Sequence, residues 1–367
     1  TTQCSNVYVE EWDVDKIYIE AVEGMSSVEL HSKKNSTYTH IATTTASRNA
    51  DGTYTITATN GTTDLSDIAC EKLRISIKDA SNNVIAAQLY KVPIIVENAI
   101  NTNDNWFVTT LGASTCANCD VIIRDNAVLE HVAGGVNDFR NLTIYETAAL
   151  RNEQTILSVE DLLIRSKRDD VGYAIIEKDN GFISANTVAH TKRIDAAYWY
   201  TFALPYDCKI ADITQANGKS MGEYGKHWGI KYYDGQARQA SGTTAGQGNS
   251  SQFWEPMPAN GVLEANHGYI IALFDASVQD DNEMRTIYFP PAENKEYTES
   301  GTDSKATTIV NWTDNLECDQ QHHGWNFTST PYIRIFNPSG MADNEDGAGM
   351  NASNVLMTGK INLVDGS

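Results

Sequence analysis

Cys116 and Cys119 are the first residues whose type and spacing could carry chemistry. A Cys-X-X-Cys motif can form a redox centre, supply half of a zinc site or close a small disulfide. A redox centre needs its first cysteine at a helix N-terminus, whereas this motif leads directly into the apolar residues 121–123, which predict a strand. A zinc site needs two more ligands at close spacing, and the adjacent His322 and His323 are distant in sequence. We therefore favour a local disulfide over a metal site and over redox chemistry.

The sequence contains six cysteines, and an even number suits an oxidising, extracellular compartment. Spacing alone does not prove a pairing. The positions at the borders of predicted strands favour three bridges: Cys4–Cys70, Cys116–Cys119 and Cys208–Cys318.

Two acidic clusters raise the question of a calcium site. Residues 343–347 resemble the middle of an EF-hand loop, but Ala342 stands at the first ligand position and Ser353 replaces the bidentate glutamate. Residues 279–283 form an acidic turn before a predicted strand. We interpret both as solvated loops and predict no metal site or cofactor, with a structural calcium ion as the alternative.

A group of aromatic residues in the second half of the chain is the best candidate for a ligand or interface surface. Flat rings beside Asn, Gln and Asp suit the faces and hydroxyl groups of sugars. The competing interpretation is that these rings fill the core of a β-sandwich. The candidate residues are Tyr198, Trp199, Trp228, Tyr232, Tyr233 and Trp254.

Catalytic patterns are weak. Asp120, Arg124, Arg165 and Arg168 could stack on one face of a β-coil, as in enzymes that cleave acidic polysaccharides. Charges at coil edges are normally solvated, however, and no nucleophile elbow, zinc-protease motif or phosphate loop occurs. We predict that the protein is not an enzyme.

The charge balance limits the partners. The chain of 367 residues has 48 acidic and 27 basic side chains, which gives a net charge of -21. Because the sequence shows no basic cluster, we expect neither nucleic acid nor an anionic membrane surface as partner. No apolar stretch is long enough for a membrane span.

An all-β fold of three parts would have to position these residues. Residues 1–97 alternate polar and apolar positions between polar turns, which predicts an Ig-like antiparallel β-sandwich. Residues 198–367 also show strand patterns and predict an aromatic-rich, jelly-roll-like β-sandwich. Trp199 and Trp325 each precede a Pro-Tyr pair after five residues, so we expect them in equivalent strands.

Between these parts, residues 105–197 contain a repeat. Ile123, Ile144, Ile164 and Ile183 follow one another in steps of 21, 20 and 19 residues, which predicts a short parallel β-solenoid with a stacked isoleucine row. A helix is the competitor, because apolar positions between 156 and 163 also fit one helical face.

Several of these segments resemble large secreted surface proteins of the Bacteroidetes. The resemblance covers about residues 105–335, and the segments that carry it are Cys116–Val121, Leu162–Arg165, Trp199–Asp207, Asn266–Ile271 and Gly324–Tyr332. It implies a stalk or scaffold region of a long, often adhesive chain at the cell surface, and it transfers no catalytic residue. Such chains often end in a sorting domain that is not visible here, so we expect a fragment of a longer protein.

Taken together, these observations predict a non-enzymatic extracellular surface protein that works as an adhesin or structural scaffold module. Its partners would be other surface chains or a host or glycan ligand. A subunit that assembles into a surface layer or filament is one alternative, and a glycan-binding accessory module is another.

Overall fold

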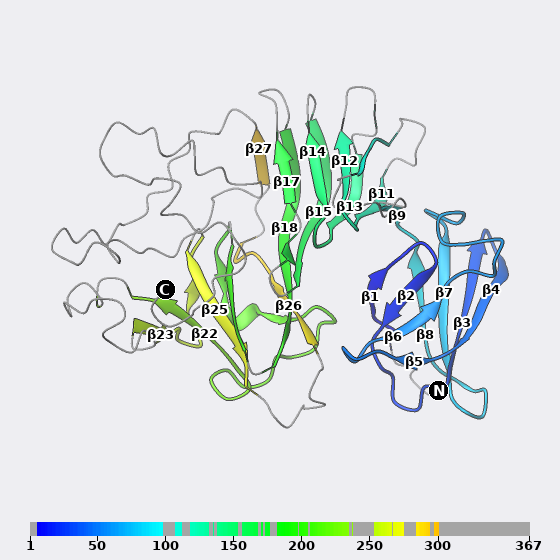
Figure 1. The fold of residues 1–367 in the computed structure, drawn as a ribbon, viewed down its shortest axis with the longest axis horizontal. Helices are drawn as coiled ribbons and strands as arrows, with labels where there is room; N and C mark the ends of the chain where they lie inside the picture. Colours follow the sequence, from blue (N-terminus) through cyan, green and yellow to red (C-terminus); the bar gives the residue numbers. More distant parts are fainter. Residues whose placement is uncertain are drawn as a thin grey trace.

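The protein is essentially all-β, as predicted, and Figure 1 shows its parts in the computed structural model. No helix in the described part is long and apolar enough to cross a membrane. The structure describes residues 6–300 except 98–106, 112–117, 132–134, 136–137, 153–155, 168–169, 172, 177–181, 197, 205, 235–236, 238–252, 266, 275–283 and 294–296.

The N-terminal part consists of two four-stranded antiparallel sheets. The first sheet has the order β1-β2-β6-β5, with β1 (Val9–Trp12), β2 (Lys16–Ile19), β6 (Tyr54–Thr57) and β5 (Ser47–Arg48). The second sheet has the order β4-β3-β7-β8, with β4 (Thr37–Thr45), β3 (Ser27–Lys34), β7 (Lys72–Lys78) and β8 (Val84–Lys91).

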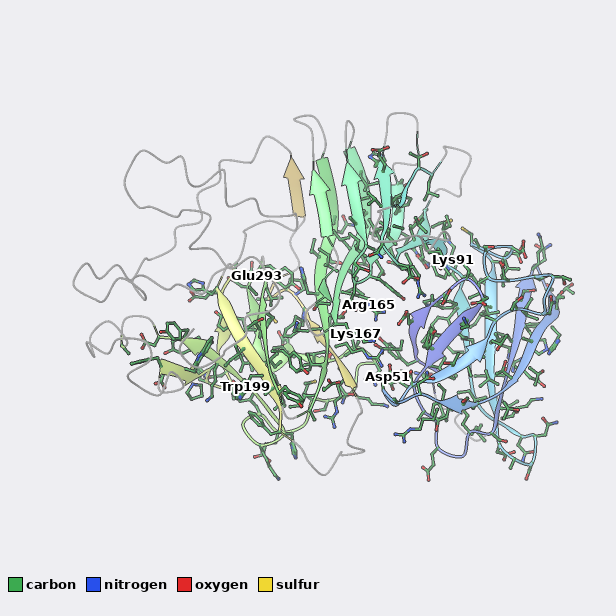
Figure 2. The ribbon with its side chains drawn as sticks, viewed as in Figure 1. Asp51, Lys91, Arg165, Lys167, Trp199 and Glu293 are labelled. Atoms are coloured by element: carbon green, nitrogen blue, oxygen red, sulfur yellow. The ribbon has the colours of Figure 1, made fainter. Side chains whose placement is uncertain are left out.

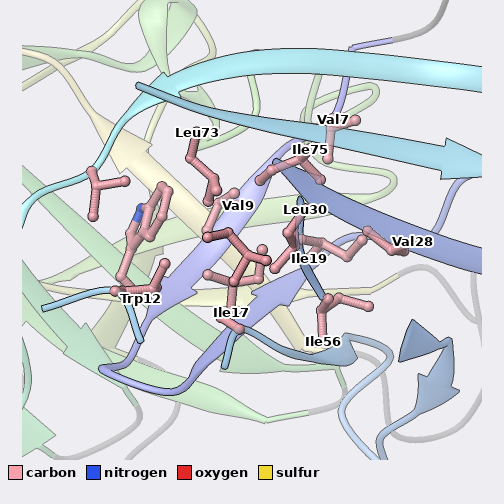
Figure 3. Packing of buried hydrophobic residues seen from close by; sticks show 14 of the residues in the cluster. Val7, Val9, Trp12, Ile17, Ile19, Val28, Leu30, Ile56, Leu73 and Ile75 are labelled. Atoms are coloured by element: carbon pink, nitrogen blue, oxygen red, sulfur yellow. The ribbon is translucent and has the colours of Figure 1, made fainter. Parts of the chain in front are cut away.

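Strict alternation builds the core between these sheets (Figure 3). In β3, Val28 and Leu30 are fully buried while their neighbours face outward, and in β7 the same holds for Leu73 and Ile75. Because a strand turns successive side chains to opposite faces, one face of each sheet packs inward and the other points away from this core. The outward face of the second sheet is therefore set by the residues between the buried ones.

The middle part, here called the coil region, consists of two parallel sheets between which the chain passes alternately. One sheet contains β9 (Ile94–Val96), β11 (Cys119–Ile123), β13 (Asp138–Ile144), β15 (Ile156–Lys167) and β18 (Phe182–Asp195), and β16 (Asp170–Val171) pairs with β15. The other contains β10 (Phe107–Thr109), β12 (Ala127–His131), β14 (Ala149–Asn152) and β17 (Tyr173–Ile176). Since β9 pairs with β11, the parallel sheet starts before residue 105.

The register of the parallel sheet supports the predicted isoleucine row at three of its four positions. Ile123, Ile144 and Ile164 are direct neighbours in adjacent strands, and all three are buried in one apolar cluster. The helical alternative for this segment is wrong, because residues 156–167 form β15. Ile183 is also wrong as the fourth member: it pairs with Leu157, and His190 lies beside Ile164. The reason is the length of β18, whose 14 residues carry the fourth isoleucine to the beginning of the strand.

His190 occupies the end of this row without a charge. Burial lowers the pKa of His190 to about 4. Its Nδ1 lies 3.1 Å from the hydroxyl of Tyr206, which itself donates to the carbonyl oxygen of Phe289 at 2.8 Å. Because that hydroxyl proton is used, the ring nitrogen acts as the donor.

The C-terminal part shares strand β18 with the coil region. Its outer sheet has the order β19-β25-β22-β23, with β19 (Trp199–Ala203), β25 (Gly268–Leu273), β22 (Trp228–Tyr233) and β23 (Trp254–Pro256). The smaller elements are β20 (Cys208–Lys209), the 3-10 turn η1 (Ile210–Asp212), β21 (Thr214–Gln215), β24 (Val262–Leu263), β26 (Met284–Phe289) and β27 (Tyr297–Ser300).

Strands β26 and β27 pair antiparallel with β18 and so extend the sheet of the coil region. Ile194 of β18 and Ile287 of β26 then pack in one cluster with Trp228 and Ile271 of the outer sheet. The described C-terminal part is thus layered like a sandwich, but one of its layers is the continuation of the coil sheet.

Charged residues join the N-terminal sandwich to the coil region. Arg124 and Arg165 were expected to be solvated coil-edge charges, and this expectation is wrong: only 6% of each residue is exposed. Residue Arg168 lies outside the described residues. Figure 2 shows Arg165 at the boundary between the two parts, where its guanidinium group lies 3.9 Å from Glu10 of the sandwich. The N-terminal sandwich covers this edge of the coil and removes it from water.

The Tyr145 ring contacts both guanidinium groups at this boundary. The guanidinium carbon of Arg165 is 4.1 Å from the ring centroid and that of Arg124 is 5.8 Å from it. The tyrosine hydroxyl accepts a hydrogen bond from the backbone N–H of Trp12 at 3.2 Å. Together with Ile122, the buried Tyr145 ring also belongs to the core cluster of the N-terminal sandwich, so the two parts pack as one unit here.

The predicted disulfides each involve a residue outside the described part, namely Cys4, Cys116 or Cys318. Cys70 and Cys208 carry free thiols in the structure. Burial raises the pKa of Cys208 to about 12, and its side chain belongs to the C-terminal core cluster. Cys119 is fully buried at the start of β11. Because Cys70 and Cys208 are free, the predicted bridges Cys4–Cys70 and Cys208–Cys318 are wrong for this structure. Cys119 is disulfide-bonded, and its predicted partner Cys116 lies outside the described residues, so that pairing stays a prediction.

Candidate functional site

The outward face of the sheet β19-β25-β22-β23 carries exposed aromatic rings above small residues. Trp199 is paired with Ala272, and Ala272 is paired with Gly229 on the next strand. Phe274 lies over this glycine, because a Cβ atom at Gly229 would come within 2.9 Å of the Phe274 ring. The small residues leave room for the rings to lie on the sheet. Trp199 is 38% exposed and Phe274 is 42% exposed.

A lysine adds a positive charge to these rings. The rings of Trp199 and Phe274 meet edge to face with centroids 5.6 Å apart. The amino group of Lys231, on the neighbouring strand β22, lies 5.0 Å from the centre of the Trp199 ring. The electron-rich face of an indole attracts a cation in this position. The contact holds the lysine chain beside the tryptophan, so the two form one surface that is apolar in the middle and charged at its edge.

A second ring pair lies farther along the same face. Tyr233 and Trp254 are direct partners in β22 and β23, with ring centroids 5.3 Å apart. Tyr233 lies four residues beyond Gly229 on β22. At the usual strand rise and spacing, the two ring pairs are therefore about 16 Å apart across the sheet. We call Trp199, Phe274, Lys231, Tyr233 and Trp254 the aromatic face.

The structure divides the aromatic residues predicted from sequence. Trp199, Tyr233 and Trp254 lie on the aromatic face. Tyr198 and Tyr232 are exposed, but alternation places them on the opposite side of the sheet.

Trp228 is a correction to the predicted ligand surface. It is 3% exposed in the C-terminal core cluster, and its indole N–H donates to the carbonyl oxygen of Gly222 at 3.3 Å. For this residue the competing core interpretation is right. Strand alternation puts it on the same side as Ile230 and hence inward.

Sequence reasoning missed Phe274 and Lys231. Phe274 ends a continuous apolar stretch that looked like core, and its exposure follows from its position one residue beyond β25. Lys231 lies between the predicted aromatics, so alternation with Tyr233 would have been a usable signal.

The aromatic face offers two indole rings, a phenyl ring, a phenol and an ammonium group. The five residues that define it include no carboxylate, thiol or imidazole. In the part of the chain that the structure describes, no group of three or more His, Cys, Asp or Glu residues could hold a metal ion. The acidic clusters at 279–283 and 343–347, and the phrase around Trp325, lie outside the described residues.

Comparison with family models, with curated proteins and with solved structures finds no match for this chain.

Proposed function

We propose that this chain is a non-enzymatic extracellular surface protein, an adhesin or structural scaffold module, and that the aromatic face is its contact surface. The observation that carries the proposal is the pair Trp199–Phe274 with Lys231 beside it. More than a third of each ring is exposed on a sheet that has its own buried core on the other side. Exposed rings of this kind are typical of contact surfaces.

Carbohydrate is the ligand class that suits this surface best. Ring faces pack against the apolar C–H face of a sugar, while an ammonium group donates hydrogen bonds to hydroxyl oxygens. Two ring pairs separated along one open sheet face suit an extended chain of sugars, which needs no enclosed pocket. This supports a glycan as the ligand of the adhesin.

The continuous packing of the three parts supports a scaffold role. Arg165 donates a hydrogen bond from Nη1 to the carbonyl oxygen of Glu10 at 2.8 Å, which links the coil region to the N-terminal sandwich. Strand β18 belongs to both the coil region and the C-terminal part. A ligand held on the aromatic face would therefore be held by a module whose parts are fixed to one another through buried contacts.

We expect the double variant Trp199→Ala, Phe274→Ala to bind immobilised neutral polysaccharides at least tenfold more weakly than the parent chain. Loss of stacking on two rings removes on the order of 1.4 kcal/mol or more, which corresponds to a factor of ten. Tyr232→Ala is the matched control, because this ring is similarly exposed on β22 but lies on the other side of the sheet. A glycan array with both variants makes the measurement, and equal loss in the control would count against the proposal.

Open sheet edges support self-assembly as a second candidate function. β4 pairs with β3 and β8 pairs with β7, so both are edge strands of the described sheet. The nine residues of β4, TYTHIATTT, include no Lys, Arg, Asp, Glu or Pro, the residues that usually protect an edge from pairing. In the sheet order β4 and β8 run antiparallel, so β8 of one copy could pair with β4 of the next.

If this pairing forms, sedimentation velocity should show species that grow with protein concentration, and Thr39→Lys in β4 should abolish them. Lysine on an edge strand opposes pairing because its charge would be buried between the two sheets. Ser158→Lys, at an exposed position of β15, serves as the control for the added charge. A chain that stays monomeric at high concentration would argue against this second function.

A further inference from the structure

The outward face of the N-terminal sheet β4-β3-β7-β8 carries a group of basic side chains that lie far apart in the sequence. One row across the four strands contains Tyr38, Lys33, Lys72 and Lys91. The adjacent row contains His40, His31, Arg74 and Leu89. These two rows, here called the basic face, hold four permanent cations and two histidines without an acidic side chain among them.

Two of the four cations of the basic face contact an aromatic ring. The Lys33 amino group lies 5.1 Å from the centre of the Tyr38 ring, and the Arg74 guanidinium carbon lies 5.8 Å from it. In the described residues, Lys33, Lys72 and Arg74 form no ion pair. The Lys91 amino group donates to the carbonyl oxygen of Asn118, a neutral acceptor, at 3.1 Å.

The nearest acidic groups on this sheet are already paired with other lysines. Glu29 accepts from Lys78 at 2.6 Å, and Glu71 lies 2.9 Å from Lys34. The four cations therefore face solvent together, although the whole chain has a net charge of -21. A local group of positive charges can attract anions even on a protein whose net charge is negative. At contact distance, dissolved salt screens this attraction only partly.

We propose that the basic face binds a linear acidic polysaccharide through the carboxylate or sulfate groups of its sugars. Neighbouring strands are about 4.8 Å apart, so Lys33, Lys72 and Lys91 form a line of charges about 10 Å long. The two rows run across the four strands of one sheet, which suits a polymer lying across the strands. This site goes beyond the proposed function, because it lies on the N-terminal sandwich and takes charged rather than neutral sugars.

Two other polyanions fit the basic face less well. Single-stranded nucleic acid binds through bases stacked on free aromatic rings, whereas the Tyr38 ring is flanked by Lys33 and Arg74. An anionic membrane is a broad plane, so it would also meet the acidic surface around the patch and be repelled by it. A single polysaccharide chain can follow the basic rows alone.

The test compares the triple variant Lys33→Gln, Lys72→Gln, Arg74→Gln with a control of equal charge change, Lys16→Gln, Lys209→Gln, Lys226→Gln. The control lysines lie at the surface away from the basic face. Binding of the full chain to immobilised polygalacturonate and to heparin is measured at 50 and 500 mM NaCl, with neutral dextran as reference. Polygalacturonate carries carboxylates and heparin also carries sulfates, so comparing the two shows which anion the basic face prefers.

We expect the parent and the control variant to bind at least one acidic polymer at low salt, and the triple variant to bind at least tenfold more weakly. High salt should weaken the parent strongly, and dextran should show no dependence on these lysines. Unchanged thermal unfolding of the triple variant confirms that the sheet is intact. The proposal is overturned if the triple variant binds like the control, or if the parent binds double-stranded DNA or phosphatidylserine vesicles as tightly as the acidic polysaccharides. Loss of acidic-polymer binding with neutral-glycan binding intact would separate this site from the aromatic face.

Discussion

Replacing Ile144 with Asp is expected to lower the free energy of unfolding by about 5 kcal/mol or more, enough to prevent the coil region from folding. Ile144 is fully buried, with Ile123 and Ile164 as its neighbours on the adjacent strands. The substitution replaces the three outer carbons of the Ile144 side chain with a carboxylate inside an apolar cluster. Urea denaturation followed by circular dichroism measures the effect.

Two further variants separate burial of charge from loss of volume. Ile144→Val keeps the row apolar and should cost about 1 kcal/mol, as removal of one methylene group usually does. Ser158→Asp introduces the same carboxylate on the exposed face of β15 and should change stability by about 0.5 kcal/mol or less. If the Ile144→Asp and Ser158→Asp variants have the same urea midpoint of unfolding, Ile144 does not lie in a packed interior row.

The coil register could be predicted from sequence because its cause is local. Each turn of the chain contributes one short apolar stretch, and the corners can be made by residues such as Asp125 and Asn126, whose φ angles of 53° and 58° lie in the left-handed region that Asp and Asn tolerate. The fourth turn departs from the pattern because β18 continues beyond the coil to pair with β26. A partner strand about 100 residues later in the sequence therefore decides where Ile183 lies.

The buried arginines and the basic face were missed for a related reason. Arg124 reads as a solvated corner, since nothing near it in sequence indicates that Glu11 and Trp12 of another part will cover it. Lys33 and Arg74 lie on strands that are distant in sequence and become neighbours when β3 pairs with β7. Strand alternation predicts that each faces outward, but the register that brings them together is a property of the folded sheet.

The aromatic residues show what alternation can and cannot decide. Trp228 and Ile230 alternate on one side of β22, and Lys231 and Tyr233 alternate on the other. The pattern therefore separates two faces, but it does not state which face is covered. That choice depends on β18 and β26, which pack against the side of Trp228, while Trp199 and Phe274 on the side of Lys231 stay partly exposed.

Replacing Arg165 with Ala is expected to destabilise the protein by about 3–5 kcal/mol, because it removes the cation beside the buried carboxylate of Glu146 and one of the two cations beside Glu10. The guanidinium group lies 3.6 Å from Glu146 and 3.9 Å from Glu10, whose side chain is 5% exposed. Burial alone would lower the pKa of Arg165, but Glu146, Tyr145 and Glu10 raise it above the ordinary value, so the group is charged in the fold. The variant also loses the stacking on Tyr145. Thermal and urea unfolding measure the change.

Arg140→Ala is the matched control for this prediction. Arg140 also pairs with a carboxylate of the coil region, Asp120, through two hydrogen bonds, but its side chain is 39% exposed. Water replaces the lost contact at such a site, so the cost should be about 1 kcal/mol or less. Equal destabilisation by Arg165→Ala and Arg140→Ala would mean that Glu146 is hydrated without the arginine and that Arg193 is a sufficient partner for Glu10. The N-terminal sandwich would then be docked by the apolar contacts of Tyr145 and Ile122, and the buried charges would fix its orientation without contributing to its stability.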